Sequence, residues 1–186
     1  RASLSMQLAC IRSLNGDRPG AAQAAAEAAR QAEDDARFQQ LSYQFSLDAG
    51  DALGAAEALN AYAVLAQDDS RYAEIADLYL EAGDYEGSGR FYDLAMENDG
   101  ESDRLLYMRG TCSMLLGHYA EAIEDFAASA MPGSVYSRGV CAMALGDLEQ
   151  AEVCFSEAIE ADEQANDARL MLAVCHLEDG EPAEAE

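Results

Sequence analysis

Apolar residues recur every three or four positions through nearly the whole chain, and short polar stretches containing glycine interrupt them. This spacing puts the apolar residues on one face of a helix. Only three prolines occur, Pro19, Pro132 and Pro182, and each lies near an expected helix start or loop. The pattern therefore predicts an all-α chain.

Six glycines divide this helical pattern at nearly regular intervals of 34, 33, 34, 29 and 34 residues. They are Gly16, Gly50, Gly83, Gly117, Gly146 and Gly180, and each is followed by Asp, His or Glu. Glycine readily adopts the left-handed conformation that ends a helix and reverses the chain. The following acid can accept a hydrogen bond from the free N–H groups of the next helix. We expect six helical pairs, with Asp17, Asp51, Asp84 and Asp147 as caps.

Small side chains also repeat with the glycines. Seven residues before each glycine stand Ala9, Tyr43, Ala76, Gly110, Gly139 and Ala173, and five after stand Ala21, Ala55, Ser88, Ala122, Ala151 and Ala185. Two antiparallel helices can approach closely where both present a small side chain. Larger residues nine after the glycine, such as Phe126 and Phe155, are expected to fill the flanks.

Two segments resemble tetratricopeptide repeats closely: Tyr107 to Phe126 and Tyr136 to Phe155. Both begin with Tyr-x-Arg-Gly, carry Leu-Gly at the turn and place Phe nine residues after the glycine. The resemblance extends over essentially the whole chain and implies a right-handed α-solenoid of about six helix-turn-helix repeats. Residues 1–186 would form a single array, with approximate repeats at 2–34, 35–68, 69–102, 103–131, 132–165 and a partial one at 166–186.

Some parts of the chain depart from this family pattern. Tyr43 stands where a small residue is expected, and Ala25 stands where an aromatic one is expected. For these outer repeats, Sel1-type and other helix-pair solenoids are the alternatives. The 29-residue interval predicts a helix that ends near Ala130 and a tight turn at Pro132-Gly133. Because the chain starts and stops inside repeats, we expect it to be part of a longer protein.

Charge narrows the classes of partner. The chain has 36 acidic and 11 basic residues, which give a net charge of −25. This field repels phosphate backbones and anionic headgroups, so we expect no nucleic-acid partner. No run of about 18 apolar residues is present, so direct membrane insertion is not expected either. A basic or apolar protein segment fits better, although the acids can also serve only to keep an Ala-rich chain soluble.

The chemistry-bearing residues form no recognisable catalytic or metal-binding motif. Cys112, Cys141 and Cys175 occupy equivalent repeat positions, too far apart for disulfides, and are expected to be small buried residues. Cys141 and Cys154 are the one pair on two helices of a single repeat, and a disulfide between them is the one alternative to free thiols. Unpaired thiols favour a reducing compartment such as the cytoplasm. The sequence contains no zinc, calcium, phosphate-loop or nucleophile motif, so it predicts no cofactor and no enzyme activity.

The resemblance implies that the first helices of successive repeats line a concave binding face. Residues ten, six and three before each glycine share one helical face. In the later repeats these include Tyr107, Thr111, Met114, Tyr136, Val140, Met143, Leu170 and Val174. In the earlier repeats the same face turns polar, with Gln40 and Gln44. Arg37 and Arg104 stand at its edge, where each can pair with a ligand or with the chain's own acids.

An exposed apolar stripe of this kind is typical of a protein-binding surface, because large apolar patches are rarely left open to water. Packing of the same residues against neighbouring helices is the alternative. The sequence therefore predicts a non-catalytic scaffold that binds a peptide or protein segment. The alternative functions are a self-assembly module and the regulatory arm of a larger protein whose activity lies outside this segment.

Overall fold

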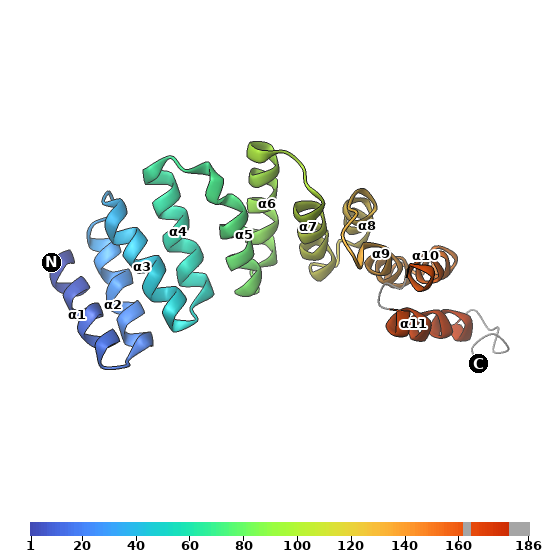
Figure 1. Cartoon of the computed structure of the whole chain (residues 1–186), viewed down its shortest axis with the longest axis horizontal. Helices are drawn as coiled ribbons and strands as arrows, with labels where there is room; N and C mark the ends of the chain where they lie inside the picture. The colour runs from blue at the N-terminus through green and yellow to red at the C-terminus, as the bar shows by residue number, and fades with distance from the viewer. Residues whose placement is uncertain (162–164, 179–186) are drawn as a thin grey trace. The chain divides into compact units, whose positions relative to one another are not determined.

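A computed structural model describes residues 1–161 and 165–178, and these contain eleven α-helices, one short 3₁₀ helix and no strand (Figure 1). The prediction of an all-α solenoid of helical repeats is confirmed. The chain divides into two compact units, Arg1–Gly100 and Glu101–Glu186. Within the described ranges, every helix is too short or too polar to cross a membrane.

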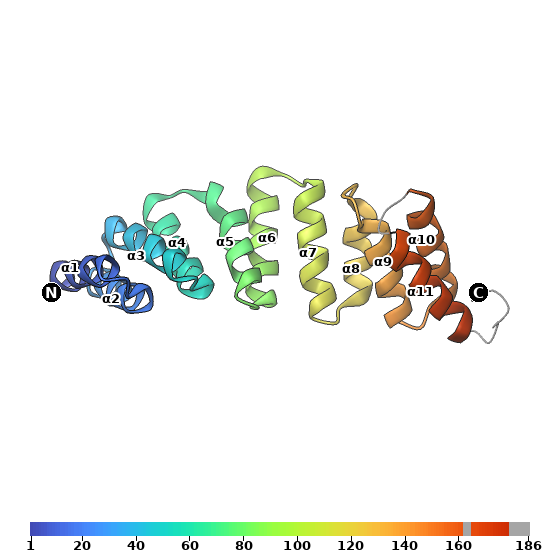
Figure 2. The ribbon, with the colours of Figure 1, turned by 60° about the horizontal axis from the view of Figure 1, so that its bottom comes forward.

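The first unit contains α1 to α6, and each helix packs against the next one along the chain (Figures 1 and 2). Their bounds are α1 Ala2–Leu14, α2 Arg18–Gln31, α3 Ala36–Ala49, α4 Ala52–Ala66, α5 Tyr72–Glu81 and α6 Tyr85–Asp99, with the 3₁₀ helix η1 at Asp69–Arg71. The helices are paired as α1–α2, α3–α4 and α5–α6, joined by hairpins at the expected glycines.

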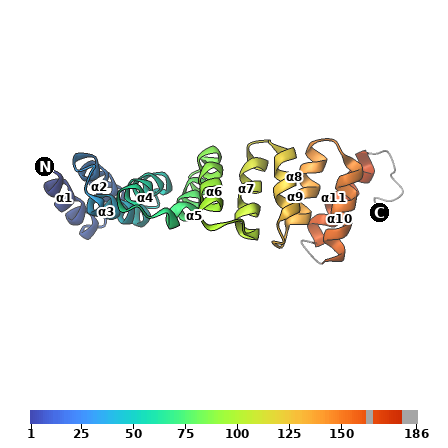
Figure 3. The same cartoon turned by 90° about the horizontal axis from the view of Figure 1, so that it is seen from above.

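The second unit contains α7 to α11, again with consecutive helices in contact (Figure 3). Their bounds are α7 Asp103–Leu115, α8 Tyr119–Ala128, α9 Ser134–Ala144, α10 Leu148–Glu160 and α11 Ala165–Glu178. The expectation that both units stack as a single array over residues 1–186 stays a prediction.

The hairpins form as the sequence predicts. Five of the six expected glycines have φ between 72° and 82°, and each lies between the two helices of a pair. Gly180 lies outside the described residues. The four expected Asp caps each accept a hydrogen bond from the backbone N–H three residues later, at 2.9–3.0 Å. His118 occupies the same position but makes no capping bond through its side chain.

The paired small residues do let the helices approach closely. Gly139 of α9 lies so near α10 that an added Cβ would stand 2.7 Å from Phe155 Cε1. Ala151, five residues after Gly146, is fully buried in the same interface. Most of the other small positions are buried as well, although Ala173 is only half-buried and Ala185 lies outside the described residues. The small side chains therefore set the spacing between paired helices.

Tyr43 departs from this rule because its side chain serves a different interface. The ring packs on the cluster formed by α4 and α5, and its hydroxyl donates a 2.5 Å hydrogen bond to Glu74 Oε1 of α5. Arg71 holds the other carboxylate oxygen of Glu74 at 2.7 Å. Burial and the Glu74 contact raise the pKa of Tyr43 to about 12. The residue thus ties α3 to α5, which explains its size at this position.

The short interval is accommodated by an early helix end. The helix α8 stops at Ala128, two residues before the expected end, and the turn at Pro132-Gly133 is confirmed, with Gly133 at φ 89°. Ser129 Oγ donates to the Asp103 carbonyl and Asp103 Oδ1 accepts from the Ala130 N–H, both at 2.8 Å. These bonds fix the link against the start of α7.

Candidate functional site

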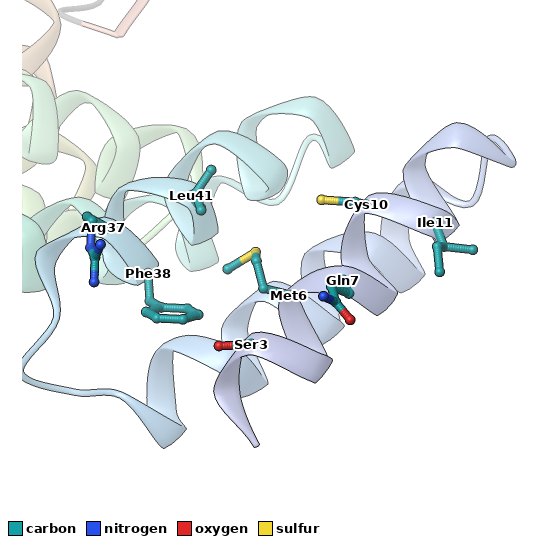
Figure 4. Close-up of a pocket in the computed structure, with 8 residues that line it drawn as sticks. All are labelled: Ser3, Met6, Gln7, Cys10, Ile11, Arg37, Phe38 and Leu41. Carbon is teal, nitrogen blue, oxygen red and sulfur yellow. The ribbon is translucent and has the colours of Figure 1, made fainter.

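An open groove lies between α1 and α3, the first helices of two successive pairs. Both helices pack on α2, and the space between them has a volume of about 690 Å³, which is within the usual range of ligand pockets. The groove is lined by Ser3, Met6, Gln7, Cys10 and Ile11 from α1 and by Arg37, Phe38 and Leu41 from α3. Figure 4 shows Ser3, Met6 and Cys10 pointing from α1 toward α3.

The floor of this groove is continuous with the core of the first unit. Met6 and Ala9 of α1 pack on alanines of α2, and Phe38 and Phe45 of α3 close the same cluster. Every buried residue of α2 is alanine or glycine, so α1 lies close against it. Phe38 therefore has two roles: it anchors α3 to the first pair and forms part of the groove.

The electrostatic character of the groove differs from that of the chain. None of its eight lining residues is acidic. The helix α1 contains no acid at all, and α3 contains only Asp48, near its C-terminal end. The groove is thus an apolar surface with one base at its edge, in a protein whose net charge is −25.

Arg37, the base at this edge, already has a partner within the chain. Its Nε and Nη2 donate to the two carboxylate oxygens of Asp35 at 3.0 and 2.6 Å. Asp35 also accepts the Arg37 backbone N–H and so caps α3. The hydrogen bonds from the Arg37 side chain hold the pKa of Asp35 below its usual value. Because the Arg37 side chain is 84% exposed, the pair contributes little to stability and leaves the guanidinium accessible.

The groove coincides only in part with the residues that the sequence indicated. Arg37 lines it, whereas Gln40 and Gln44 are exposed on α3 outside the lining. The sequence pattern predicted a polar face in the early repeats and did not indicate Phe38, Leu41 or Ile11. None of these three residues stands ten, six or three positions before a hairpin glycine. The available signal was the apolar pair Phe38 and Leu41 at three-residue spacing.

In the second unit, many residues of the predicted stripe pack within the protein. The Tyr107 and Tyr136 rings lie 5.4 and 5.6 Å from the rings of Phe126 and Phe155. The Thr111 hydroxyl donates to the Tyr107 carbonyl. The half-buried members are Tyr107, Thr111, Met114, Tyr136, Val140, Met143 and Val174. Leu170 is 59% exposed and Arg104 is also exposed.

The two arginines of the Tyr-x-Arg-Gly segments differ in their contacts, and Arg109 supports structure. Arg109 donates from Nε and Nη2 to the two carboxylate oxygens of Asp125, at 2.9 and 2.5 Å. Arg138 has Cys154 at the equivalent place, sixteen residues later, and its buried Nε has no hydrogen-bond partner among the described residues. Neither arginine belongs to the groove or to the stripe.

The cysteines divide into one exposed and four buried thiols. Cys10 is exposed in the wall of the groove, whereas Cys112, Cys141, Cys154 and Cys175 are buried. No disulfide joins Cys141 to Cys154, and burial raises the pKa of Cys141 to about 11. Across residues 1–161 and 165–178, no group of three or more His, Cys, Asp or Glu side chains is arranged to hold a metal ion.

Comparison with known proteins agrees with this architecture. The family model for the tetratricopeptide repeat matches residues 136–186. The segment 136–186 is thus similar to a tetratricopeptide repeat. No curated protein sequence matches the chain significantly. The groove lies outside this segment, between the first helices of two successive helical pairs.

Solved tetratricopeptide structures share the fold at low sequence identity. MamA from Desulfovibrio magneticus RS-1 is 17% identical, with a TM-score of 0.68 over 81% of this chain and 88% of that one. YrrB, described as a tetratricopeptide protein with an unusual peptide-binding site, is 18% identical, with a TM-score of 0.65 over 88% of each chain. The pilus biogenesis factor PilW is 16% identical, with a TM-score of 0.61 over 99% of this chain and 88% of that one. These likenesses establish the fold.

Proposed function

We propose that this protein is a non-catalytic interaction scaffold that binds segments of partner proteins along the first helices of its repeats. The observation that carries the proposal is the groove between α1 and α3, in which Phe38 and Leu41 are accessible to a ligand and Met6 forms the largely buried floor. Ligand-binding pockets typically have a volume of this order and a mostly apolar lining with a few polar groups. The peptide-binding site named for YrrB, a protein of the same fold, supports the proposal.

The predicted stripe of the second unit is proposed as a further contact surface. Its members are Tyr107, Thr111, Met114, Tyr136, Val140, Met143, Leu170 and Val174, with Arg104 at the edge. Half-burial leaves part of each tyrosine and methionine available, and Leu170 presents most of its side chain. Leu170 is therefore the best position at which to test this surface without disturbing the core.

The proposal is tested with peptides selected from a random library against the whole chain. Leu41→Asp removes an apolar wall of the groove, and Leu14→Asp makes the same change at a site that is 88% exposed and outside it. Burying a leucine contributes about 1.5–3 kcal/mol, so Leu41→Asp should weaken binding roughly tenfold or more. Leu170→Glu, with Val153→Glu on α10 as control, probes the stripe in the same way. If Leu41→Asp and Leu170→Glu each bind like their controls, neither surface is the binding site.

A second candidate function is self-association through α1. Leu4, Leu8 and Ile11 lie on one helical face and are 69%, 42% and 55% exposed. Leu4 and Ile11 stand 34 residues before Phe38 and Phe45, the residues by which α3 docks on the preceding helical pair. A second copy could cover this face. Light scattering at high protein concentration decides the matter: a strict monomer would rule out self-association, and a dimer should dissociate in the Leu4→Asp variant.

A further inference from the structure

We infer that the groove between α1 and α3 selects partner segments whose anchoring side chains are apolar and uncharged, and discriminates against basic segments. This inference rests on the proposed function and specifies its partner class. It is opposite to what the net charge of −25 suggests for the chain as a whole. The reason is the local distribution of charge around the groove.

A basic side chain that entered the groove would find no counter-charge. The lining contains no acid, and Asp35, beside Arg37 at the edge, is already bound by that guanidinium. Contact with Met6, Phe38 and Leu41 would remove hydration water from the incoming charge. No ion pair would compensate for this desolvation, so binding of a basic side chain is unfavourable. It would also approach Arg37, a charge of the same sign.

The acids elsewhere on the surface do not reverse this preference. At physiological ionic strength, interactions between exposed charges are screened beyond about 8 Å. Glu33 and Asp34 line a neighbouring hollow that shares only Arg37 with the groove. The negative field of acids outside the groove mainly raises the association rate of basic partners, while the contacts inside the groove decide which side chains stay bound. Selection therefore follows the apolar lining.

The residues present suit an apolar anchor with an ordinary peptide backbone. Met6 can adapt to the shape of an incoming side chain, because methionine is unbranched and flexible. Phe38 and Leu41 offer apolar contact from the opposite wall. Gln7 and Ser3, both exposed, supply donors and acceptors that can satisfy the backbone amides of a bound segment.

The test begins with phage-displayed random peptides selected on the whole chain at 50 mM and at 500 mM NaCl. An enriched peptide is then synthesised with Leu, Asp or Lys at its anchor position, and binding is followed by fluorescence anisotropy. Protection of Cys10 from a thiol reagent reports that the peptide occupies the groove, because Cys10 lies in its wall and the other four cysteines are buried.

We expect the peptide with a Lys anchor to bind at least about tenfold more weakly than the peptide with a Leu anchor. The affinity of the Leu-anchored peptide should change by less than about threefold between 50 and 500 mM NaCl. Gln7→Glu places an acid in the groove and should recover about tenfold of the Lys-anchored binding. Gln23→Glu is the matched control, because it adds the same charge at an exposed position of α2 outside the groove.

Three results would overturn the inference. Enriched peptides could be basic and lose binding at 500 mM NaCl, Gln7→Glu and Gln23→Glu could act alike, or the peptides could leave Cys10 unprotected. In each of these cases peptide binding itself would still stand. Failure to enrich any peptide would instead refute the proposed function, and the inference would fail with it.

Discussion

The close approach of α9 and α10 at Gly139 can be tested by adding a single methyl group. In Gly139→Ala, the new Cβ would stand 2.7, 2.9 and 3.0 Å from Phe155 Cε1, Cδ1 and Cζ. Carbon atoms prefer about 3.5–4.0 Å, and the Phe155 ring is fully buried and packed against Tyr136. The ring cannot move away without disturbing its neighbours.

Two opposing effects decide the sign of the change. Alanine is favoured over glycine inside a helix by about 1 kcal/mol, whereas overpacking a core costs about 1–3 kcal/mol. With three contacts at or below 3.0 Å, we expect overpacking to dominate and the free energy of unfolding to fall by up to about 2 kcal/mol. Gly110→Ala should cost less, because its nearest contacts are 3.0 and 3.1 Å.

Urea denaturation followed by circular dichroism measures this difference, and Phe155→Leu provides the control. The substitution removes Cε1 and Cζ, two of the three crowded atoms, so Gly139→Ala should cost less in that background than in the otherwise unchanged protein. The reasoning is refuted if Gly139→Ala stabilises the otherwise unchanged protein by about 1 kcal/mol, the full helix-propensity gain.

Three further outcomes follow from individual side chains. Asp51→Ala should lower the free energy of unfolding by about 1 kcal/mol, because it removes a helix cap. His118→Ala removes no capping bond and should change this free energy little. Thermal melting of both variants measures the difference. A thiol reagent should modify one cysteine rapidly in the folded protein, at Cys10, and all five after denaturation, as absorbance of the released chromophore would show. The pKa of Tyr43 is higher in the folded protein, about 12, than its ordinary value of 10.0. The neutral hydroxyl therefore stabilises the fold fully below pH 10, and this stabilisation is lost as the pH rises toward about 12. Stability measured from pH 9 to 12 should therefore fall more steeply in the unchanged protein than in Tyr43→Phe.

The hairpins and helix contacts could be predicted from sequence because they depend on local conformation and residue size. Gly50 and Asp51 specify a turn and a cap within a few residues, and Gly139 and Phe155 specify a close contact within one repeat. The role of Tyr43 could not be predicted in this way, since its partner Glu74 lies 31 residues away on another helix pair.

The groove was harder to predict than the hairpins for a related reason. Its opening depends on how far α2 separates α1 from α3, and that distance is set by packing across three helices. Comparing equivalent positions identified Arg37 but not Phe38 or Leu41, which lie between the positions compared. The predicted stripe likewise did not distinguish Leu170, which is exposed, from Tyr107, which rests on Phe126.

The interface of α2, built only from alanine and glycine, links ligand binding to folding. Each buried side chain of α2 removes little apolar surface from water, because it is small. The first helical pair therefore depends on Phe38 and Phe45 of α3 for large apolar contacts. A partner side chain seated between α1 and α3 would act as a missing core residue. A free peptide concentration 100 times its dissociation constant would then stabilise the folded protein by about 2.7 kcal/mol. The helix α1 would therefore resist local unfolding most strongly when a peptide fills the groove.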